Sequence, residues 1–180
     1  INEPKNTEHS KYFELVDINN YEALLRAMMD FQPDYVVHLA ARTDLNGADL
    51  NSYLANTKGV ENIARCCKES PSVKRLILAS TKLIAPTDAQ VSDLTSYSPD
   101  TIYGESKALG EKIIESNKYF DNWIIVRPTS IWGPWSLAKN HPYGKFFQII
   151  KKGLYIHPEV VDQPRYFGYV ENSCFQIYTL

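Results

Sequence analysis

The sequence predicts an α/β protein built on a doubly wound parallel sheet, and two observations carry this prediction. Helical and strand-like segments alternate along roughly the first 130 residues. The strand-like segments are apolar almost throughout, which is typical of parallel strands that are covered on both faces. A chain of 180 residues is long enough for one domain with a sizeable core and short for two.

The first predicted pair is a helix followed by a strand. Asn19 or Asn20 can cap the helix, its apolar residues recur at helical spacing, and Pro33 prevents its continuation. A strand follows at about Tyr35–Ala40 and is apolar apart from His38. We interpret His38 as a hydrogen-bonded core side chain and not as a metal ligand.

Two further pairs repeat this order. A helical pattern over residues 52–70 ends at Pro71, and a strand follows at residues 73–80. A second helical pattern over residues 103–117 precedes a strand at residues 123–128. Three strands joined by helical connections predict a parallel sheet, because parallel neighbours need long crossovers.

The composition changes after Pro128, where Trp, Pro, Gly and Tyr become frequent. We therefore predict a dinucleotide-binding domain over residues 1–134 and part of a smaller substrate-binding lobe over residues 135–180. Residues 160–180 either belong to that lobe or return to the first domain. Within the second part we expect one helix and two strands, at residues 143–152, 154–158 and 165–170.

Composition and charge exclude several classes of protein. A net charge of -2 with scattered basic residues predicts no nucleic-acid surface. No apolar run is long enough to cross a membrane. Cys66, Cys67 and Cys174 have neither a disulfide framework nor a metal-ligand spacing, so we predict no metal site and a reducing, cytoplasmic location.

Ligands of open α/β sheets bind beyond the carboxyl ends of the strands. Three short segments directly follow predicted strands, at residues 40–42, 80–82 and 128–130. The small side chains of Ala40 and Ala41 would let a flat ligand approach the backbone. Ser80 and Thr81 would bring hydroxyl groups to the same edge.

Tyr103 and Lys107 form the motif YGESK at the start of a predicted helix. Residues four apart share a helix face, and the positive end of the helix dipole favours negative charge there. An ammonium beside the phenol would lower the pKa of Tyr103, which makes the phenol a candidate general base. A hydroxyl from Ser80 or Thr81 could hold the substrate oxygen. A YxxxK pair also arises by chance, so its place after a Ser-Thr strand end is what gives it weight.

Seven segments in order resemble the extended short-chain dehydrogenase/reductase family, in particular its NAD-dependent sugar-nucleotide epimerases and dehydratases. They are VDI at 16–18, VVHLAA at 36–41, NTKG at 56–59, LAST at 78–81, YGESK at 103–107, RPTSIWGP at 127–134 and RYFGYVEN at 165–172. The resemblance covers nearly the whole chain. It implies a Rossmann-like fold, a nucleotide-sugar substrate and NAD as cofactor, with NADP as the alternative.

The resemblance also implies a role for each matching residue. Tyr103 is the catalytic base, Lys107 lowers its pKa and holds the nicotinamide ribose, and Thr81 is the catalytic hydroxyl, with Ser80 as the alternative. The implied cofactor-binding residues are Asp17, Ile18, Leu39, Ala40, Ala41, Asn56, Ala79, Tyr103, Lys107, Pro128 and Ile131. The implied substrate-binding residues are Thr81, Ser130 and Arg165, the last as a phosphate ligand.

The sequence departs from the family pattern at three places. Lys82 and Leu83 follow Thr81 where the dehydratases of the family carry an acidic pair, which disfavours a dehydratase. Ser130 and Trp132 replace the usual Asn and Tyr, which weakens any substrate assignment by analogy. No glycine-rich GxxGxxG turn is present among the eight glycines. We therefore expect a fragment that lacks its first β-α-β unit.

These inferences favour a sugar-nucleotide 4-epimerase that works through a transient ketosugar. One alternative is a reductase of keto-sugars or other carbonyls that consumes NADPH, and another is a non-catalytic nucleotide-binding protein of the same fold. By resemblance we also expect a homodimer formed through the helices around residues 52–70 and 103–118. The sugar, the nucleotide and the choice between NAD and NADP are not encoded in these residues.

Overall fold

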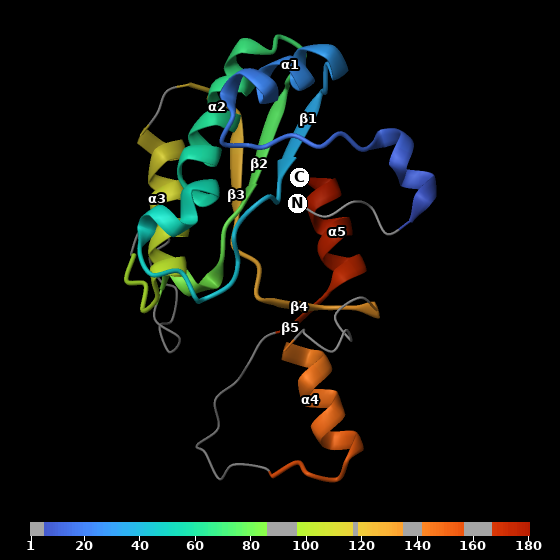
Figure 1. The fold of residues 1–180 in the computed structure, drawn as a ribbon. Helices are drawn as coiled ribbons and strands as arrows, with labels where there is room; N and C mark the ends of the chain where they lie inside the picture. Colours follow the sequence, from blue (N-terminus) through green and yellow to red (C-terminus); the bar gives the residue numbers. More distant parts are fainter. Residues whose placement is uncertain (1–5, 86–96, 117–118, 135–141, 157–166) are drawn as a thin grey trace. The chain divides into compact units, whose positions relative to one another are not determined.

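The computed structural model describes residues 6–85, 97–116, 119–134, 142–156 and 167–180. The chain divides into two compact units, Ile1–Arg127 and Pro128–Leu180, and each unit is described by itself. Figure 1 shows the elements coloured along the sequence. The assignment of a cofactor-binding domain and a substrate lobe to parts of this chain stays a prediction.

A parallel three-stranded sheet lies at the centre of the first unit, in the order β1 (Tyr35–His38), β2 (Arg75–Ala79), β3 (Trp123–Val126). Val37 pairs with Ile77, and Ile77 pairs with Ile124. The strands run side by side in Figure 1. The predicted α/β class with a parallel sheet is confirmed.

Three helices form a layer that packs on the sheet: α1 (Tyr21–Phe31), α2 (Lys58–Glu69) and α3 (Ile102–Ser116). α1 packs on α2, and α2 packs on α3. The core cluster joins Leu76 and Leu78 of β2 to Val60 and Ile63 of α2. Each such side chain contributes about 1.5–3 kcal/mol when it is fully removed from water, so this layer provides much of the stability of the unit.

α1 begins and ends at the residues that its sequence signals predict. The Asn20 side chain accepts a hydrogen bond from the N–H of Ala23 at 3.1 Å, which satisfies a free donor of the first turn. At the other end Gln32 adopts a left-handed conformation with φ 50°, and Pro33 follows. A proline at that place cannot continue the helix.

The helix predicted over residues 52–70 is wrong in its first part. The structure has a 3-10 helix, η2 (Leu50–Asn56), then a break at Thr57, and only then α2. Tyr53 has a non-helical φ of -118° and ψ of 32° within η2. The buried side chains of Tyr53 and Asn56 form hydrogen bonds with the loop after β1. These long-range contacts outweigh the helical pattern of the sequence, so the segment does not form a continuous α-helix.

Two shorter 3-10 helices also lie in the first unit, η1 (Thr7–Tyr12) and η3 (Lys82–Ile84). η3 follows β2 directly and therefore shapes the carboxyl edge of the sheet. The Thr81 hydroxyl caps it by accepting a hydrogen bond from the N–H of Leu83 at 3.2 Å.

The second unit contains a parallel two-stranded sheet and two helices: β4 (Ser130–Trp132), α4 (Pro142–Lys151), β5 (Phe167–Tyr169) and α5 (Val170–Thr179). α4 agrees with the predicted helix, and β5 lies in the predicted strand 165–170. Residues 154–156 form no strand, which corrects the first half of the strand predicted at 154–158. Residues 157 and 158 lie outside the described residues. β4 and α5 were not predicted.

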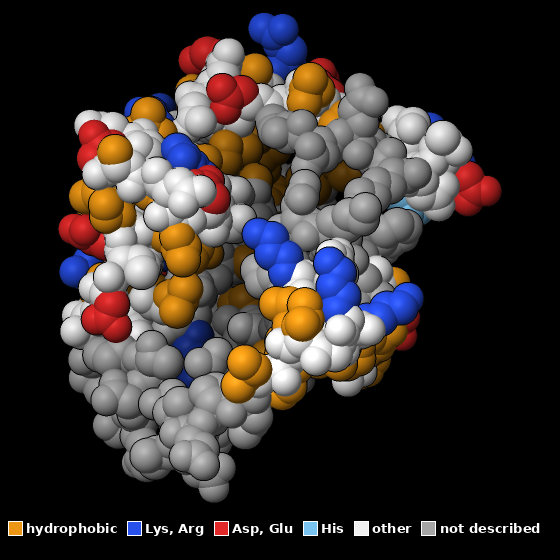
Figure 2. All heavy atoms as spheres, turned by 60° about the horizontal axis from the view of Figure 1, so that its bottom comes forward, with side chains coloured by type: hydrophobic (Ala, Val, Ile, Leu, Met, Phe, Trp, Pro, Cys, Tyr) orange, Lys and Arg blue, Asp and Glu red, His pale blue; other side chains and the backbone are white. Residues whose placement is uncertain are grey.

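The described surface mixes chemical types. Acidic and basic side chains are interspersed with hydrophobic ones on the face that Figure 2 shows. Across the described ranges, no helix is long and apolar enough to cross a membrane. In the same residues, no group of three or more His, Cys, Asp and Glu side chains is placed to hold a metal ion.

Candidate functional site

The register of the sheet brings the carboxyl ends of its strands to one edge. His38 pairs with Leu78, and Ala79 pairs with Val126. The N–H of Ser80 donates to the carbonyl oxygen of Val126 at 2.8 Å, so the pairing extends just past the end of β2. The segments after β1 and β2, which the sequence predicts as ligand-facing, therefore lie side by side at this edge.

α3 delivers Tyr103 and Lys107 to the site from its first two turns. Thr101 lies just before the helix, and its hydroxyl accepts a hydrogen bond from the N–H of Gly104 at 3.0 Å. Tyr103 is 9% exposed and Lys107 is 4% exposed. Both side chains therefore lie on the buried face of the helix, as the i, i+4 spacing predicts.

Gly104 lets the end of β2 approach the start of α3. A Cβ atom at this residue would lie 2.3 Å from the carbonyl oxygen of Leu83 in η3, a distance that no real contact allows. The Thr81 side chain, which caps η3, lies near Tyr103 and acts to lower the pKa of the phenol. The structure thus joins the predicted hydroxyl and the predicted phenol.

Lys107 is anchored on the end of β2. Its Nζ donates to the carbonyl oxygen of Ala79 at 2.6 Å. Burial lowers the pKa of Lys107 to about 8, and the negative charge of Glu111 acts in the opposite direction. A buried ammonium at the strand ends can donate to the hydroxyl groups of a ligand, since its other two N–H groups have no hydrogen-bond partner among the described residues.

The pKa of Tyr103 corrects one expectation. It is raised above its ordinary value, because burial removes water from the phenolate; the nearby Thr81 lowers it, and the nearby Tyr53 raises it. Lys107, which the sequence predicts to lower this pKa, is not among these causes, and its ammonium donates to the carbonyl of Ala79. The phenol is therefore a poorer base than expected.

Ser80 lies beside Thr81 but makes different contacts. Ser80 is buried, and its Oγ has no hydrogen-bond partner in the described part of the chain. Thr81, and not Ser80, interacts with Tyr103. Of the two candidate hydroxyls, the geometry therefore favours Thr81 as the one that acts with the phenol.

His38 ends β1 close to Lys107. It is buried as predicted, but its Nε2 has no hydrogen-bond partner among the described residues, which corrects the expected hydrogen-bonded state. Burial and, second, the charge of Lys107 lower the pKa of His38 to about 4. The ring is therefore neutral near pH 7.

Asn56 braces the backbone around the site. Its Oδ1 accepts from the N–H of Arg42 at 2.9 Å, and its Nδ2 donates to the carbonyl oxygen of Arg42 at 3.0 Å. The same Nδ2 donates to the Ser106 hydroxyl at 2.9 Å, which in turn donates to the carbonyl oxygen of Tyr103 at 2.7 Å. One buried amide thus links the loop after β1 to the turn of α3 that carries the phenol. Its contact with a cofactor stays a prediction.

Tyr53 is a site residue that the sequence reading missed. It is fully buried, its hydroxyl donates to the carbonyl oxygen of Asp44 at 2.8 Å, and it accepts from the N–H of Gly47 at 3.1 Å. Its ring centroid lies 6.2 Å from that of Tyr103. In the sequence Tyr53 is one aromatic residue within a helical pattern, so only the folded loop reveals its contacts.

The first predicted cofactor segment is held by α2. The Asn62 side chain donates to the carbonyl oxygen of Ile18 at 2.9 Å, and Gly59 leaves room for the Ile18 side chain. Asp17 Oδ1 accepts from the N–H of Asn19 at 2.9 Å and lies at the surface. The segment is therefore fixed in place while its acidic side chain faces water.

The strand ends present an open, mainly apolar edge with two buried polar groups. Leu39 is 62% exposed, Ala40 is exposed, and Ala41 is half-buried, so an apolar, small-residue edge stays open to a flat ligand. The partnerless Ser80 hydroxyl and the Lys107 ammonium lie at the same edge, next to the half-buried Ala79. These donors suit the hydroxyl groups of a ribose.

The remaining predicted residues are described separately or not at all. Pro128 and Ile131 are half-buried and Ser130 is exposed, and all three belong to the second unit. Arg165 lies outside the described residues. The predicted contacts of these four residues with cofactor and substrate therefore stay predictions.

A buried ion pair one turn beyond Lys107 was also missed. The guanidinium of Arg127 donates to the carboxylate of Glu111, with 2.6 Å between Nη2 and Oε2. The Tyr97 hydroxyl donates to the same carboxylate at 3.0 Å. The Glu111 side chain is fully buried. A Glu at i+8 from Tyr103 on the same helical stripe is the signal that would have pointed to it.

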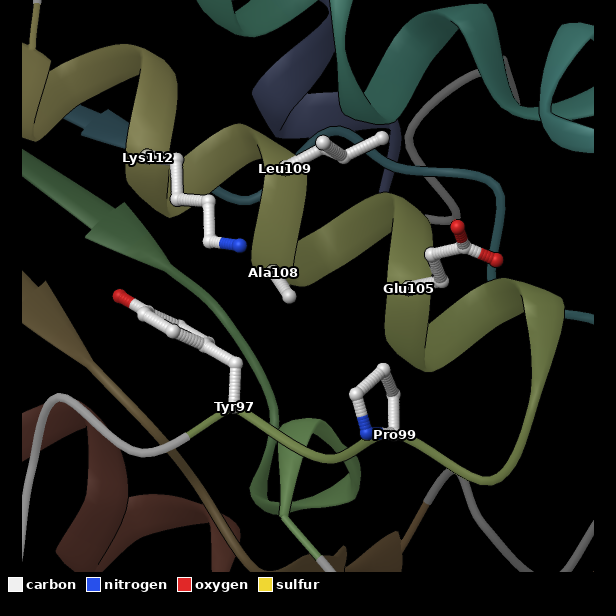
Figure 3. A pocket seen from close by; sticks show the side chains of 6 residues that line it. All are labelled: Tyr97, Pro99, Glu105, Ala108, Leu109 and Lys112. Carbon is white, nitrogen blue, oxygen red and sulfur yellow. The ribbon is translucent and has the colours of Figure 1, made fainter.

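A surface pocket of about 330 Å³ lies on another stripe of α3. Figure 3 shows that Glu105, Ala108, Leu109 and Lys112 line it from the helix, and that Tyr97 and Pro99 line it from the preceding segment. Tyr103 and Lys107 are not among these residues. The chemistry at the strand ends, and not the size of a pocket, therefore identifies the candidate site.

Known proteins resemble this chain along nearly its whole length. The sequence model of the NAD dependent epimerase/dehydratase family matches residues 2–178. The chain is 27% identical over 179 residues to a protein of Bacillus subtilis described as an uncharacterized UDP-glucose epimerase, YtcB. That alignment covers 93% of this chain and 55% of the relative.

A second relative has a different activity. The chain is 29% identical over 175 residues to the GDP-6-deoxy-D-talose 4-dehydrogenase of Aggregatibacter actinomycetemcomitans. This alignment covers 93% of this chain and 58% of the relative. The chain thus spans somewhat more than half the length of these curated relatives.

A solved structure is similar to this chain in its fold. The crystal structure of the Bordetella bronchiseptica enzyme WbmG in complex with NAD and UDP matches with a TM-score of 0.74 and 26% identity. The match covers 92% of this chain and 52% of that one. The predicted Rossmann-like class is confirmed.

Proposed function

Because this chain belongs to the NAD dependent epimerase/dehydratase family, we propose that the full-length protein is a sugar-nucleotide 4-epimerase. One observation carries the proposal. Thr81, Tyr103 and Lys107 come together at the carboxyl edge of a parallel sheet. This is the edge at which such sheets bind ligands.

Tyr103 exchanges a proton with the sugar hydroxyl. Burial raises the pKa of the phenol, and in its neutral form the phenol donates a proton to the oxygen of a ketosugar. Removal of the proton in the opposite step requires the phenolate. Thr81 helps, since it acts to lower the pKa of the phenol and so favours the charged form. The hydroxyl of Thr81 also orients the substrate oxygen.

Lys107 and the strand ends hold the cofactor. The Lys107 ammonium, fixed by the carbonyl of Ala79, donates to the nicotinamide ribose, and Leu39, Ala40 and Ala41 lie along the cofactor. NAD, when bound, accepts a hydride from the sugar carbon and returns it. Asp17 and Ile18 lie along the adenine end. We assign NAD, with NADP as the alternative.

The substrate is a nucleotide sugar, with Thr81, Ser130 and Arg165 as its ligands. Relatives described as acting on UDP-linked and GDP-linked sugars support the class. Because one of these relatives is a 4-dehydrogenase, a reductase that releases oxidised cofactor is a second candidate. A homodimer formed through residues 52–70 and 103–118 is part of the proposal.

Replacing Tyr103 by Phe in the full-length protein tests the proposal. We expect turnover of a UDP-hexose to fall by about 10²–10⁴-fold, because the proton can no longer be transferred. Calorimetry should find binding of NAD and UDP little changed. Tyr21→Phe, which removes a phenol hydroxyl from α1, should retain turnover.

Two outcomes would contradict the assignment. Retained turnover in the Tyr103→Phe variant would remove Tyr103 from the chemistry. Consumption of one NADPH for each product formed by the wild-type protein would replace the epimerase by the reductase, since an epimerase shows no net change in its cofactor.

A further inference from the structure

Glu111 lies where its charge acts on the proposed cofactor lysine. Tyr103, Lys107 and Glu111 follow one another at four-residue spacing on α3, so their side chains share one helical stripe. Lys107 is 4% exposed and Glu111 is fully buried. The carboxylate lies one turn beyond the ammonium on the inner side of the helix.

Burying an ammonium is unfavourable unless nearby groups compensate for the lost water. The groups that face Lys107 are the carbonyl of Ala79 on β2, His38 at the end of β1, and Glu111 on its own helix. The carbonyl supplies one hydrogen bond, and His38 is neutral near pH 7. Among these groups Glu111 alone brings a negative charge.

Glu111 is itself held in place by partners from two other segments. Burying a carboxylate is unfavourable unless cations or donors compensate for the lost water. Arg127 supplies a guanidinium that donates from Nε at 3.0 Å to Oε1 and from Nη2 at 2.6 Å to Oε2. Tyr97 adds a donor from the segment before α3, at 3.0 Å. These contacts fix the rotamer of the Glu111 side chain.

We propose that Glu111 is a positioning residue that acts through Lys107: its carboxylate, held by Arg127 and Tyr97 one turn along the same buried stripe, stabilises the buried ammonium at the end of β2. The inference rests on the proposed function for the part that Lys107 plays in the reaction. The effect of Glu111 on the Lys107 ammonium does not depend on that function and can be measured without it.

The test measures the titration of Lys107 by NMR in the full-length protein labelled at the lysine side chain, without cofactor or substrate. The Lys107 signal is assigned by its absence in Lys107→Met. Glu111→Gln should move the pH midpoint of Lys107 down by about one unit, which is a typical effect of removing one close charge. Glu115→Gln is the matched control, because Glu115 also accepts from Tyr97, at 3.2 Å, but is exposed. It should leave the midpoint in place.

Glu111→Gln deprives Arg127 of its carboxylate and could prevent folding. The double variant Glu111→Leu, Arg127→Met removes both charges, and buried ion pairs often tolerate such replacement. It should lower the midpoint in the same direction. The proposal is overturned if Lys107 keeps its wild-type pH midpoint in either variant, provided that this variant folds.

Turnover separates the inference from the function on which it rests. If the function holds, the alkaline limb of the pH profile of turnover should move down with the midpoint in Glu111→Gln. A merely structural role for Glu111 would lower stability and leave that limb in place. Absence of epimerase turnover in the wild-type protein would count against the proposed function, while the NMR titration would still decide the role of Glu111.

Discussion

Helices α2 and α3 pack against one another in the same layer, yet they bury different chemistry. α2 buries mainly apolar side chains and thiols, among them Val60, Ile63 and Cys67, in the core cluster. α3 buries Tyr103, Lys107 and Glu111 along one stripe. Neighbouring helices of one layer can thus serve stability and chemistry separately.

The difference follows from what each helix meets. α2 packs on apolar side chains of β2, and burial raises the pKa of the Cys67 thiol to about 12, so the thiol stays neutral. α3 begins at the carboxyl edge of the sheet, where carbonyl, hydroxyl and amide groups remain available. Lys107 therefore finds the carbonyl of Ala79, and Glu111 finds the guanidinium of Arg127.

The largest effect on stability is expected in α2. Ile63→Ala should lower the free energy of unfolding by about 2–5 kcal/mol, because it leaves a cavity in the core. Urea denaturation measures this loss, and the exposed Lys68→Ala should change little. Turnover of the folded protein at low temperature should be retained. A loss of turnover at full folding would show that α2 does more than support the core.

Lys107→Met is expected to raise the stability of the fold and to lower turnover. Because burial lowers the pKa of Lys107 to about 8, from 10.5 in the unfolded chain, folding pays roughly 3 kcal/mol to keep it charged below pH 8. The carbonyl of Ala79 loses a donor in the variant, at about 1 kcal/mol. We therefore expect a net gain of about 2 kcal/mol near pH 7 together with a loss of turnover.

The pH dependence supplies the control for this variant. In the wild type the unfolded chain binds more protons than the folded chain between pH 8 and 10.5, so stability should rise with pH across this window. Lys107→Met should lack that rise, and Lys112→Met, exposed on the same helix, should retain it. Equal slopes in wild type and Lys107→Met would mean that the ammonium is not buried in solution.

Gly104→Ala should have the smallest effect on stability and a selective effect on turnover. Its Cβ would lie 2.3 Å from the carbonyl oxygen of Leu83, so η3 must move away from α3. Such overpacking costs about 1–2 kcal/mol. We expect kcat to fall about tenfold, since Thr81 moves away from Tyr103 and transition-state contacts depend on position. The exposed neighbour Glu105→Ala should leave kcat unchanged, and an unaltered kcat in Gly104→Ala would break the link between the two elements.

The sequence predicted the sheet and its edge because these depend on local patterns. Apolar runs gave β1, β2 and β3, Asn20 and Pro33 bounded α1, and the YxxxK spacing put Tyr103 and Lys107 on one face. The break at Thr57 was not predictable, since it results from contacts of Tyr53 and Asn56 with a loop distant in sequence. The spacing of Glu111 from Tyr103 is visible in the sequence, but its pairing with Arg127 joins two distant elements and is decided only by the fold.

The sequence by itself determined which residue types can transfer a proton or hold a ribose, because side-chain chemistry and helical spacing are local properties. Only the tertiary structure decided their charge. Burial raised the pKa of Tyr103 where a neighbouring cation was expected to lower it, and the carbonyl of Ala79 drew the Lys107 ammonium to the end of β2. Solvent exclusion and long-range partners set these properties, and both arise only when distant segments pack together.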